Sequence, residues 1–519
     1  LMGAAMVLTA CGGGSTTAPT TGASSGGETQ TASESAESGK ITKTDIVVGQ
    51  ASDIVTLDPA GQQDTTSGVL MKHAYSTLLD VDNEGKVVPD LAESYEMKSD
   101  TEYVFKLRED ACFWDGTPVT AQDVKFSLDR AKGMPKTKSN TSKIEEVTVN
   151  GDHEVTIKLT EPYAAFKTIV TQHNLSILSE KAVTEAGDSY GDVDNLLGSG
   201  PFKVTEWVPN DHYTLVRNDN YWGEMPIATS ITCRVIPEGS ARTIALEAGE
   251  IDVVWSVDPT DCANVESNPD VKLLSQPSTG IDYVGMNTQK EKFSDKRVRQ
   301  AINYALDKQT FVDTIIEGRG LVANSYINAA IPGWTDEVEA YPYDPEKAKE
   351  LLAEAGYPDG FECSIFVNGD LRTRSAQILQ AQLADVGIKV DISTYEWGAL
   401  LDTLNAGEHE MFLLGWSNTS FDPDGSTYQL FYSGNHGATG NRAFFSNDKV
   451  DELILSAQRE SEESKRMELY KELQFVLHEE SPWCPLYYKE NNVGVRADLK
   501  GFTLHAGAQH YLGNCHYEE

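Results

Sequence analysis

The chain has 519 residues, of which 39% are hydrophobic and 24% are charged, a composition typical of a globular protein. A chain of this length exceeds what one hydrophobic core usually organises, so we expect two large lobes or one lobe with a large insertion. The 80 acidic and 42 basic side chains give a net charge of −38, which argues against nucleic acid as a partner. The sequence has no run of 18 or more apolar residues, the length that a membrane-spanning helix needs.

Residues 1–11 are typical of the end of a signal peptide. Leu1 to Ala10 is short and apolar, with small residues before a cysteine, and we interpret it as a truncated signal peptide. Leu8-Thr9-Ala10-Cys11 resembles the bacterial lipobox, in which the cysteine is acylated and becomes the new N-terminus. We therefore expect Cys11 to carry a lipid anchor, and the alternative is a chance cysteine after an ordinary signal peptide.

Residues 12–40 consist almost entirely of Gly, Ser, Thr, Ala and Glu. Such a segment buries too little apolar surface to offset the entropy of ordering it. We predict a disordered tether with a root-mean-square reach of about 30 Å, which would hold a globular body away from a membrane.

Six cysteines follow Cys11, and none of them has the C-x-x-C spacing of a metal or redox site. Disulfide bonds and free buried thiols are both open alternatives for this set: Cys112, Cys233, Cys262, Cys363, Cys484 and Cys515.

Strand and helix patterns begin after Lys40. Asp45 to Gly49 is a short apolar strand, and Tyr103 to Leu107 alternates like a half-buried strand. Thr120 precedes Asp123 by three residues, close to a capping box, and the apolar residues that follow share one helical face.

The second half of the chain alternates helices and strands more regularly. Arg297 to Ile316 has helical spacing, and Asp344-Pro345 predicts the start of another helix that ends near Gly356. A strand over residues 361–367, a helix over 374–386 and a strand over 388–392 predict a parallel βαβ unit. Two such α/β lobes place a ligand site in the crevice at their strand ends.

Five stretches occur in an order that is typical of one family. They are Cys112–Leu128 (CFWDGTPVTAQDVKFSL), Gly198–Phe202 (GSGPF), Ala248–Asp252 (AGEID), Phe293–Asn303 (FSDKRVRQAIN) and Tyr343–Ala348 (YDPEKA). Over nearly all of its exported length the chain resembles the solute-binding proteins of the peptide/opine/nickel class, family 5, which serve ABC importers.

This resemblance implies a two-lobed α/β fold of the periplasmic-binding-protein type, class II, with an extra subdomain inserted in the first lobe. On that pattern residues 41–284 form lobe I, with the inserted subdomain at about 70–195. Residues 285–485 form lobe II, and residues 486–519 return to lobe I. Ligand binding is expected to close the lobes about a hinge.

Two tryptophans are the leading candidates for the crevice. Trp397 follows the strand that ends at Ile392, and Trp416 follows the apolar run Met411 to Leu414. The resemblance implies that both line the pocket, as in peptide-binding relatives, and packing in the core is the alternative. An indole offers a rigid apolar face and one hydrogen-bond donor to varied side chains.

The loop after Trp416 departs from the family pattern. Peptide-binding members commonly have an aspartate three residues after this tryptophan, where it pairs with the ammonium group of the ligand, but Thr419 is found here. We expect Asp422 to bind the ammonium instead, with Thr419 giving a neutral hydrogen bond. Tyr283 and Asn287, at the expected lobe crossing, are further candidates that either bind the ligand or stabilise the crossing.

No catalytic constellation is present, because H-E-x-x-H, G-x-S-x-G and P-loop patterns are all missing. The enzyme alternative is a glycosidase, which needs only two carboxylates that face one cleft. A metal site is the other alternative, with His505, His510, Cys515 and His516 as ligands. We do not expect the metal site, because the spacing of these four residues matches no common metal site and the tail is expected to pack away from the crevice. We do not expect an enzyme either.

The sequence therefore predicts a lipid-anchored extracytoplasmic substrate-binding protein, not an enzyme and without a cofactor. We expect it to bind di- or oligopeptides and to deliver them to the permease and ATPase subunits of an ABC importer. The alternative ligands are nickel or a metal complex, an oligosaccharide or an opine, and the remaining alternative is an exported hydrolase.

Overall fold

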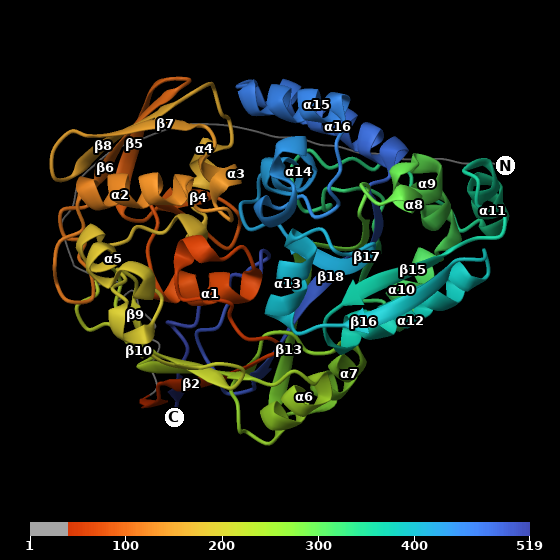
Figure 1. Ribbon diagram of the computed structural model, residues 1–519. Helices are drawn as coiled ribbons and strands as arrows, with labels where there is room; N and C mark the ends of the chain where they lie inside the picture. The colour runs from red at the N-terminus through yellow and green to blue at the C-terminus, as the bar shows by residue number, and fades with distance from the viewer. Residues whose placement is uncertain (1–39) are drawn as a thin grey trace, which may run out of the picture. The chain divides into compact units, whose positions relative to one another are not determined.

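The computed structural model describes residues 40–519, which are built on one mixed sheet of eleven strands (Figure 1). The sheet has the strand order β16-β15-β17-β13-β18-β12-β2-β11-β10-β9, and β14 pairs with β18 beside this path. Its strands are β2 (Asp45–Gln50), β9 (Phe202–Val208), β10 (His212–Arg217), β11 (Ser230–Val235), β12 (Val253–Val254), β13 (Val271–Met286), β14 (Gly320–Val322), β15 (Glu362–Val367), β16 (Lys389–Thr394), β17 (Met411–Ser417) and β18 (Trp483–Arg496).

The long antiparallel strands β13 and β18 run through both lobes of the sheet. Residues 271–277 of β13 pair with 490–496 of β18 beside the strands of the first lobe, and residues 281–285 pair with 483–488 beside β17. The register shifts between Pro277 and Ile281, where the two lobes meet. The predicted two-lobed fold is confirmed. The predicted boundaries after residues 284 and 485 fall within these two strands, and they stay predictions.

The first lobe carries a separate antiparallel sheet with the order β5-β6-β8-β7, on which α2 packs over its own hydrophobic cluster. The capping box predicted at Thr120 is present, since Thr120 and Asp123 cap each other's backbone N–H. The remaining strands here are β1 (Ile41–Lys43), β3 (Leu79–Val81), β4 (Val87–Pro89), β5 (Ala92–Ser99), β6 (Glu102–Leu107), β7 (Ile144–Val149), β8 (Glu154–Leu159) and β19 (Tyr517–Glu518).

Helices of the first part of the chain are α1 (Thr65–Ala74), α2 (Ala121–Lys132), α3 (Lys138–Thr141), α4 (Phe166–Ile169), α5 (Glu180–Ala186), α6 (Gly239–Glu247) and α7 (Pro259–Ser267). Short 3₁₀ helices lie at Pro59–Gly61, His173–Leu175, Gly187–Ser189, Val193–Asn195, Ser433–Asn435 and Gly437–Thr439. At the other end of the chain β19 pairs with β1, so the C-terminal tail returns to the first lobe.

The second lobe contains the predicted βαβ unit, because β15 and β16 are parallel and α12 connects them. The predicted helix over Arg297 to Ile316 is instead two helices, because Asp307 interrupts it and caps the second one through the N–H of Gln309. Its helices are α8 (Glu291–Ser294), α9 (Lys296–Ala305), α10 (Lys308–Thr314), α11 (Pro345–Glu354), α12 (Gly369–Ala384), α13 (Trp397–Asn405), α14 (Asp424–Phe431), α15 (Asp448–Arg459) and α16 (Glu463–Glu480).

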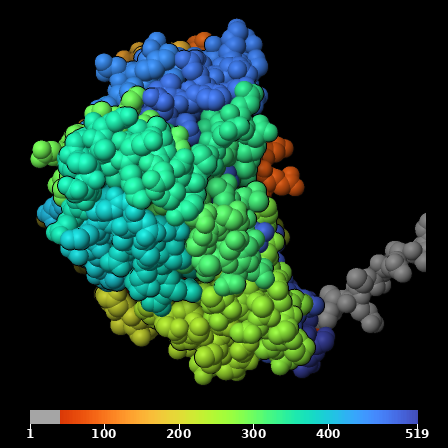
Figure 2. All heavy atoms as spheres, turned by 90° about the vertical axis from the view of Figure 1, so that its right-hand side faces the viewer, coloured from red at the N-terminus to blue at the C-terminus, as the bar shows by residue number. Residues whose placement is uncertain are grey.

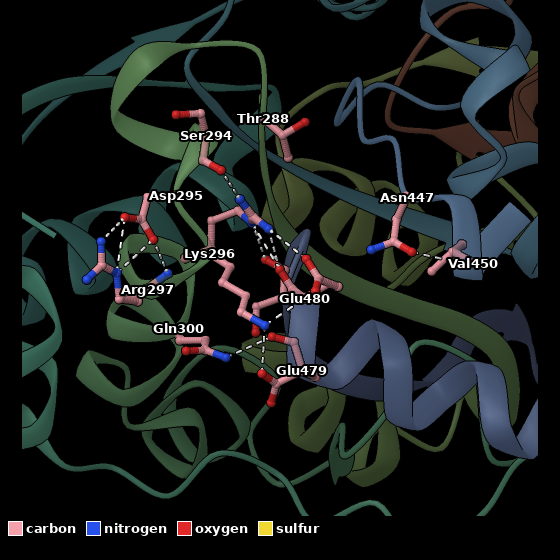
Figure 3. A network of polar contacts seen from close by, with 12 residues as sticks. Thr288, Ser294, Asp295, Lys296, Arg297, Gln300, Asn447, Val450, Glu479 and Glu480 are labelled. Atoms are coloured by element: carbon pink, nitrogen blue, oxygen red, sulfur yellow. Dashed lines mark hydrogen bonds and ion pairs between the residues drawn. The ribbon is translucent and has the colours of Figure 1, made fainter.

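A polar network joins the start of α9 to the end of α16 (Figure 3). Lys296 pairs with Glu479 at 2.7 Å and with Glu480 at 3.4 Å, and Gln300 donates to the carbonyl of Glu479. These bonds hold the outer helix α16 against the core of the lobe. Figure 2 shows the outer face of this lobe in green to cyan, with α15 and α16 in blue above it and α6 and α7 in yellow-green below.

Six cysteines lie among residues 40–519, and all of them are free thiols. Of the two alternatives left open by the sequence, the structure favours free thiols. Within the same residues no helix combines the length and the apolar character that crossing a membrane requires. Cys11 and nearly all of the expected tether lie outside the described residues.

Candidate functional site

A cavity of about 390 Å³ lies where the two lobes meet. Its walls come from α1 and the crossing strand β18, from the end of β17, from the first turns of α12 and α13, and from tail residues 505–510. Figure 1 shows α1 and α13 near each other at the centre of the molecule. A cavity of this size encloses a small ligand, since such sites usually measure about 300–1,000 Å³.

Both predicted tryptophans line this cavity. Trp397 is the first residue of α13, and its indole N–H is buried with no hydrogen-bond partner among residues 40–519. Trp416 lies near the end of β17, and its indole N–H donates to the carbonyl of Gly425 at 3.0 Å. Both side chains are only partly buried, so each presents part of an indole face to the cavity.

Thr419 also lines the cavity, but its hydroxyl is already bonded to another part of the protein. It donates to the side-chain carbonyl of Gln172 at 2.7 Å. Helix α14, which follows the loop after β17, makes further bonds of this kind, from Tyr163 to Asp424 at 2.6 Å and between Ser142 and Tyr428 at 3.0 Å. Thr419 therefore helps to hold the second lobe against the part of the first lobe that carries the small sheet.

Asp422, which we expected to bind a ligand ammonium, does not line the cavity. Its carboxylate forms a two-pronged ion pair with Arg466 of α16, at 2.9 and 2.5 Å, and also accepts from the N–H of Asp424. Asp422 and Arg466 are both buried, and neither lines the cavity. The carboxylate is thus used to neutralise a buried guanidinium of the same lobe.

Tyr283 and Asn287, the further ligand-binding candidates from the sequence, are both buried away from the cavity wall. The ring of Tyr283 is 1% exposed and stacks on Trp483, with 3.4 Å between ring centroids. The amide of Asn287 is buried and donates to the carbonyls of Gly407 and His409. Neither residue lines the cavity, and both stabilise the crossing strand β13, which was the alternative left open.

Two arginines of the second lobe line the cavity, and neither pairs with a carboxylate of residues 40–519. Arg442 uses its Nε to donate to Asn405 at 3.0 Å. Burial lowers the pKa of the Arg442 guanidinium below its usual value, and the nearby Tyr283 and Asp64 side chains oppose this effect. Arg372, in the first turn of α12, lies over the ring of Trp397 at 5.8 Å.

Asp64 contributes a carboxylate from the first lobe. One oxygen caps α1 by accepting from the N–H of Ser67 at 2.9 Å, and the other is buried with no hydrogen-bond partner among residues 40–519. Burial raises the pKa of the Asp64 carboxyl above its usual value, although the bonds from Ser67, the charge of Lys136 and the nearby indole N–H of Trp397 oppose this effect. The cavity therefore has an unpaired carboxylate oxygen on one wall and unpaired guanidiniums on the other.

The C-terminal tail reaches the cavity, contrary to our expectation that it packs away from the crevice. His505, Gln509 and His510 all line the wall. The Nδ1 atom of His505 accepts from the N–H groups of Gly507 and Gln509, and that of His510 accepts from the N–H of His505. Among residues 40–519 no three His, Cys, Asp or Glu side chains are arranged to hold a metal ion.

A model of the bacterial extracellular solute-binding proteins, family 5, matches residues 86–438. The chain belongs to this family. It is 32% identical over 479 residues to the glutathione-binding protein GsiB of Shigella boydii, an alignment that covers 89% of this chain and 92% of that protein. Proteins of the family bind a small molecule or a peptide and work with the permease and ATPase components of ABC importers.

Solved structures of family 5 solute-binding proteins have the same fold. DppA from Helicobacter pylori in complex with the peptide STSA has a TM-score of 0.88 and 28% identity, over 92% of this chain and 99% of that one. AgaA from A. tumefaciens R10 in complex with agropinic acid has a TM-score of 0.85 and 27% identity, over the same shares. Homologous binding proteins thus hold both peptides and an acidic non-peptide solute.

Sequence reasoning missed Asp64, Arg372, Arg442 and Gln509 among the residues that line the cavity, and it considered His510 only as a metal ligand. Asp64 was open to prediction only as a helix cap, since it precedes Thr65-Thr66-Ser67. No sequence pattern around Arg372 or Arg442 marks them as binding residues, because what distinguishes them is the lack of a carboxylate partner among residues 40–519. An unpaired charge becomes visible only when the three-dimensional neighbours are known.

Proposed function

We propose that this family 5 solute-binding protein is an extracytoplasmic receptor that binds a short peptide in the cavity between its lobes. The observation that carries the proposal is the charge arrangement of the cavity, with a free carboxylate oxygen of Asp64 on one wall and the guanidiniums of Arg372 and Arg442 on the other. A peptide has an ammonium and a carboxylate at its ends, which this arrangement complements. The faces of Trp397 and Trp416 would pack against the groups between them.

The cavity volume favours a short ligand. At about 390 Å³ it is near the lower end of the range for sites that enclose a small molecule. The bond from Thr419 to Gln172 joins the two lobes at the cavity wall. We therefore propose a ligand of two to four residues, which the receptor releases unchanged to the permease.

Titration of the purified full-length protein tests this role. We expect glutathione or the tetrapeptide STSA to change the intrinsic tryptophan fluorescence, because two indoles line the cavity. The melting temperature should rise with ligand concentration, since a ligand at 100 times its Kd stabilises the native state by about 2.7 kcal/mol. Mass spectrometry of the recovered ligand should find it intact. The peptide role is refuted if no peptide changes either signal up to millimolar concentration, and fragments would indicate a hydrolase.

An acidic opine is the second candidate, because unpaired arginines would bind its carboxylates equally well. The homologous AgaA structure holds agropinic acid, which supports this alternative. Agropinic acid belongs in the same titration, and stabilisation by agropinic acid but by no peptide would favour the opine.

We also propose that Cys11 carries the lipid that holds the receptor at the membrane. The support for this is the Leu8-Thr9-Ala10-Cys11 pattern and the polar segment that follows it. In the bacterial host, Cys11→Ala should move the protein from the membrane fraction to the medium or periplasm, while Cys112→Ala should leave it in the membrane fraction. If the Cys11 variant remains in the membrane fraction, the anchor lies elsewhere.

A further inference from the structure

The charged side chains of the cavity wall differ from those of the whole chain, and what we infer from them rests on the receptor role proposed above. Acidic residues outnumber basic ones 80 to 42 in the sequence. In the wall basic side chains outnumber acidic ones: Lys72, Arg319, Arg372, Arg442 and Lys489 against Asp64, Asp80 and Glu490. A local reversal of this kind indicates a ligand with negative charge.

Three of these basic side chains already have partners in the protein. Lys72 pairs with Asp80 at 2.9 Å, Arg319 pairs with Glu266 at 2.7 Å, and Lys489 pairs with Asp282 at 2.7 Å. Only Arg372 and Arg442 line the wall without a carboxylate partner among residues 40–519.

Arg442 is the more unusual of the two, because it is almost completely buried. Its exposed fraction is 6%, close to the 7% of Arg466, yet Arg466 has two bonds to the carboxylate of Asp422. Arg442 has one bond from Nε to an amide oxygen, so its remaining N–H donors have no protein acceptor among residues 40–519. A buried guanidinium without an anion is costly to the fold, and a ligand carboxylate would remove that cost.

Arg372 is held by Trp397 and not by an acid. Its guanidinium lies over the indole ring, and its Nε is buried with no hydrogen-bond partner among residues 40–519. Both arginines belong to the second lobe, and both line the cavity. Stacking on an indole leaves the edge of a guanidinium free to bind a carboxylate in two-pronged geometry.

The acidic side chains leave one clear position for a cation. Asp80 pairs with Lys72 at 2.9 Å. Asp64 and Glu490 are both half-buried, but of these three acids only Asp64 has a buried oxygen without a hydrogen-bond partner among residues 40–519, and the indole N–H of Trp397 lies beside this carboxyl. A ligand ammonium at this oxygen would be desolvated and paired.

We infer that the ligand carries two carboxylates, which bind Arg442 and Arg372, and one ammonium, which binds Asp64. This charge pattern belongs to a small acidic peptide with a free amine, such as a γ-glutamyl peptide, and differs from that of a neutral peptide with one carboxylate. Arg442 and Arg372 are then ligand-binding residues that select for acidic peptides.

Isothermal titration with a matched set of tripeptides tests the pattern. Glutathione has both carboxylates and the amine, its glycyl monoethyl ester lacks one carboxylate, 4-aminobutanoyl-Cys-Gly lacks the other, and N-acetylglutathione lacks the amine. We expect each of the three altered peptides to bind at least tenfold more weakly than glutathione. Equal binding of 4-aminobutanoyl-Cys-Gly, the ester and glutathione would refute the inference and leave the peptide role intact, whereas no binding of any peptide would refute the role itself.

Variants assign each charge to its residue. In Arg442→Gln and Arg372→Gln, glutathione should bind at least tenfold more weakly, and each variant should become insensitive to the loss of one particular carboxylate. Asp64→Asn should become insensitive to N-acetylation, whereas Glu490→Gln should remain sensitive to it. If Arg442→Gln still discriminates against both altered carboxylates as the wild type does, Arg442 does not bind one.

The melting temperature of the ligand-free protein separates binding from folding. Arg442→Gln should melt at the same temperature as the wild type or higher, because it removes an unpaired buried charge. Arg466→Gln is the matched control, since it removes an equally buried guanidinium that has a carboxylate partner, and it should melt lower. A drop of equal size in both variants would mean that Arg442 serves the fold, which would overturn its assignment.

Discussion

The carboxylate of Asp422 lies in the loop that follows the pocket tryptophan Trp416, yet it faces away from the cavity. Its partner Arg466 is 44 positions further along the chain and belongs to α16. Asp424, two residues later, is also buried, and burial together with the charge of Asp422 raises its pKa to about 6. This part of the second lobe thus contains two acids but one guanidinium, and the raised pKa of Asp424 reflects the negative charge that Arg466 leaves unneutralised.

We predict that Asp422→Asn destabilises the fold without weakening ligand binding. Removing one partner of a buried ion pair typically costs about 3–5 kcal/mol, and the nearby Asp424 should keep the loss at the lower end of that range. Urea denaturation should show the lower midpoint, and titration with glutathione should give an unchanged Kd. Lys449→Gln, which removes an exposed ion pair, is the control and should change neither value. A tenfold weaker Kd in Asp422→Asn would restore its role in binding.

Side chains that sequence reasoning placed correctly on the cavity share one property. Trp397 and Trp416 follow strands whose ends meet at one edge of a sheet, so their position depends on local order in the chain. Arg442 and Asp64 depend on which groups come near them from other elements, and periodicity or spacing carries no such information. The sequence did not show whether Tyr283 binds the ligand, because a tyrosine on the crossing strand β13 can either pack in the core or bind a ligand.

Helices and strands were predicted correctly from the sequence where a capping residue or the spacing of apolar residues marks their ends. Asp344 caps α11, Thr120 and Asp123 form the capping box of α2, and the βαβ unit around α12 has the predicted order. The exception is the split between α9 and α10, because the apolar period continues through Asp307 while its carboxylate starts a new helix. At Asp307 the capping carboxylate, and not the spacing of apolar residues, determines where one helix ends and the next begins.

Long-range strand pairing was accessible only through the family resemblance. The pairing of β13 with β18 joins residues about 200 positions apart, and neither strand shows where its register shifts. The tail had been expected to return to the first lobe, and β19 does pair with β1. Residues 505–510 nevertheless line the cavity, because the tail passes the site before it reaches that sheet. Nothing in the local pattern of the tail distinguishes these two stretches.

In the whole molecule, six of the ten histidines are held neutral by burial. Burial lowers the pKa of His73, His409, His478 and His505 to about 4, and that of His173 and His510 to about 3. Unfolded imidazoles take up a proton near pH 6.5. Between pH 6.5 and 4 the unfolded state therefore binds more protons than the native state, and the free energy of unfolding must fall as the pH falls.

We predict that the melting temperature declines steadily from pH 6.5 to pH 4. Each unit of pKa shift corresponds to about 1.4 kcal/mol per histidine. Three acids act in the opposite direction, and their stabilising contribution grows as the pH falls. Burial raises the pKa of Asp90 to about 7, that of Asp424 to about 6, and that of Asp64 above its usual value. Because six histidines oppose three acids, we expect a net loss of stability, which thermal melts in buffers of equal ionic strength would measure.

His73 offers a direct check of this mechanism. Its Nδ1 donates to the carbonyl of Val69 at 2.8 Å, and its Nε2 accepts from the N–H of Leu512 at 3.0 Å, so α1 and the tail are joined only while the ring is neutral. His73→Gln should melt lower than the wild type at pH 7, because it loses these bonds. The decline of its melting temperature between pH 6.5 and 4 should be shallower than that of the wild type, because the unfolded chain has one histidine fewer to take up a proton. His212→Gln is the control: it removes a histidine whose pKa is raised, and it should not make the decline shallower. A wild-type melting temperature that stays level from pH 6.5 to 4 would show that the buried histidines do not control the acid stability of the fold.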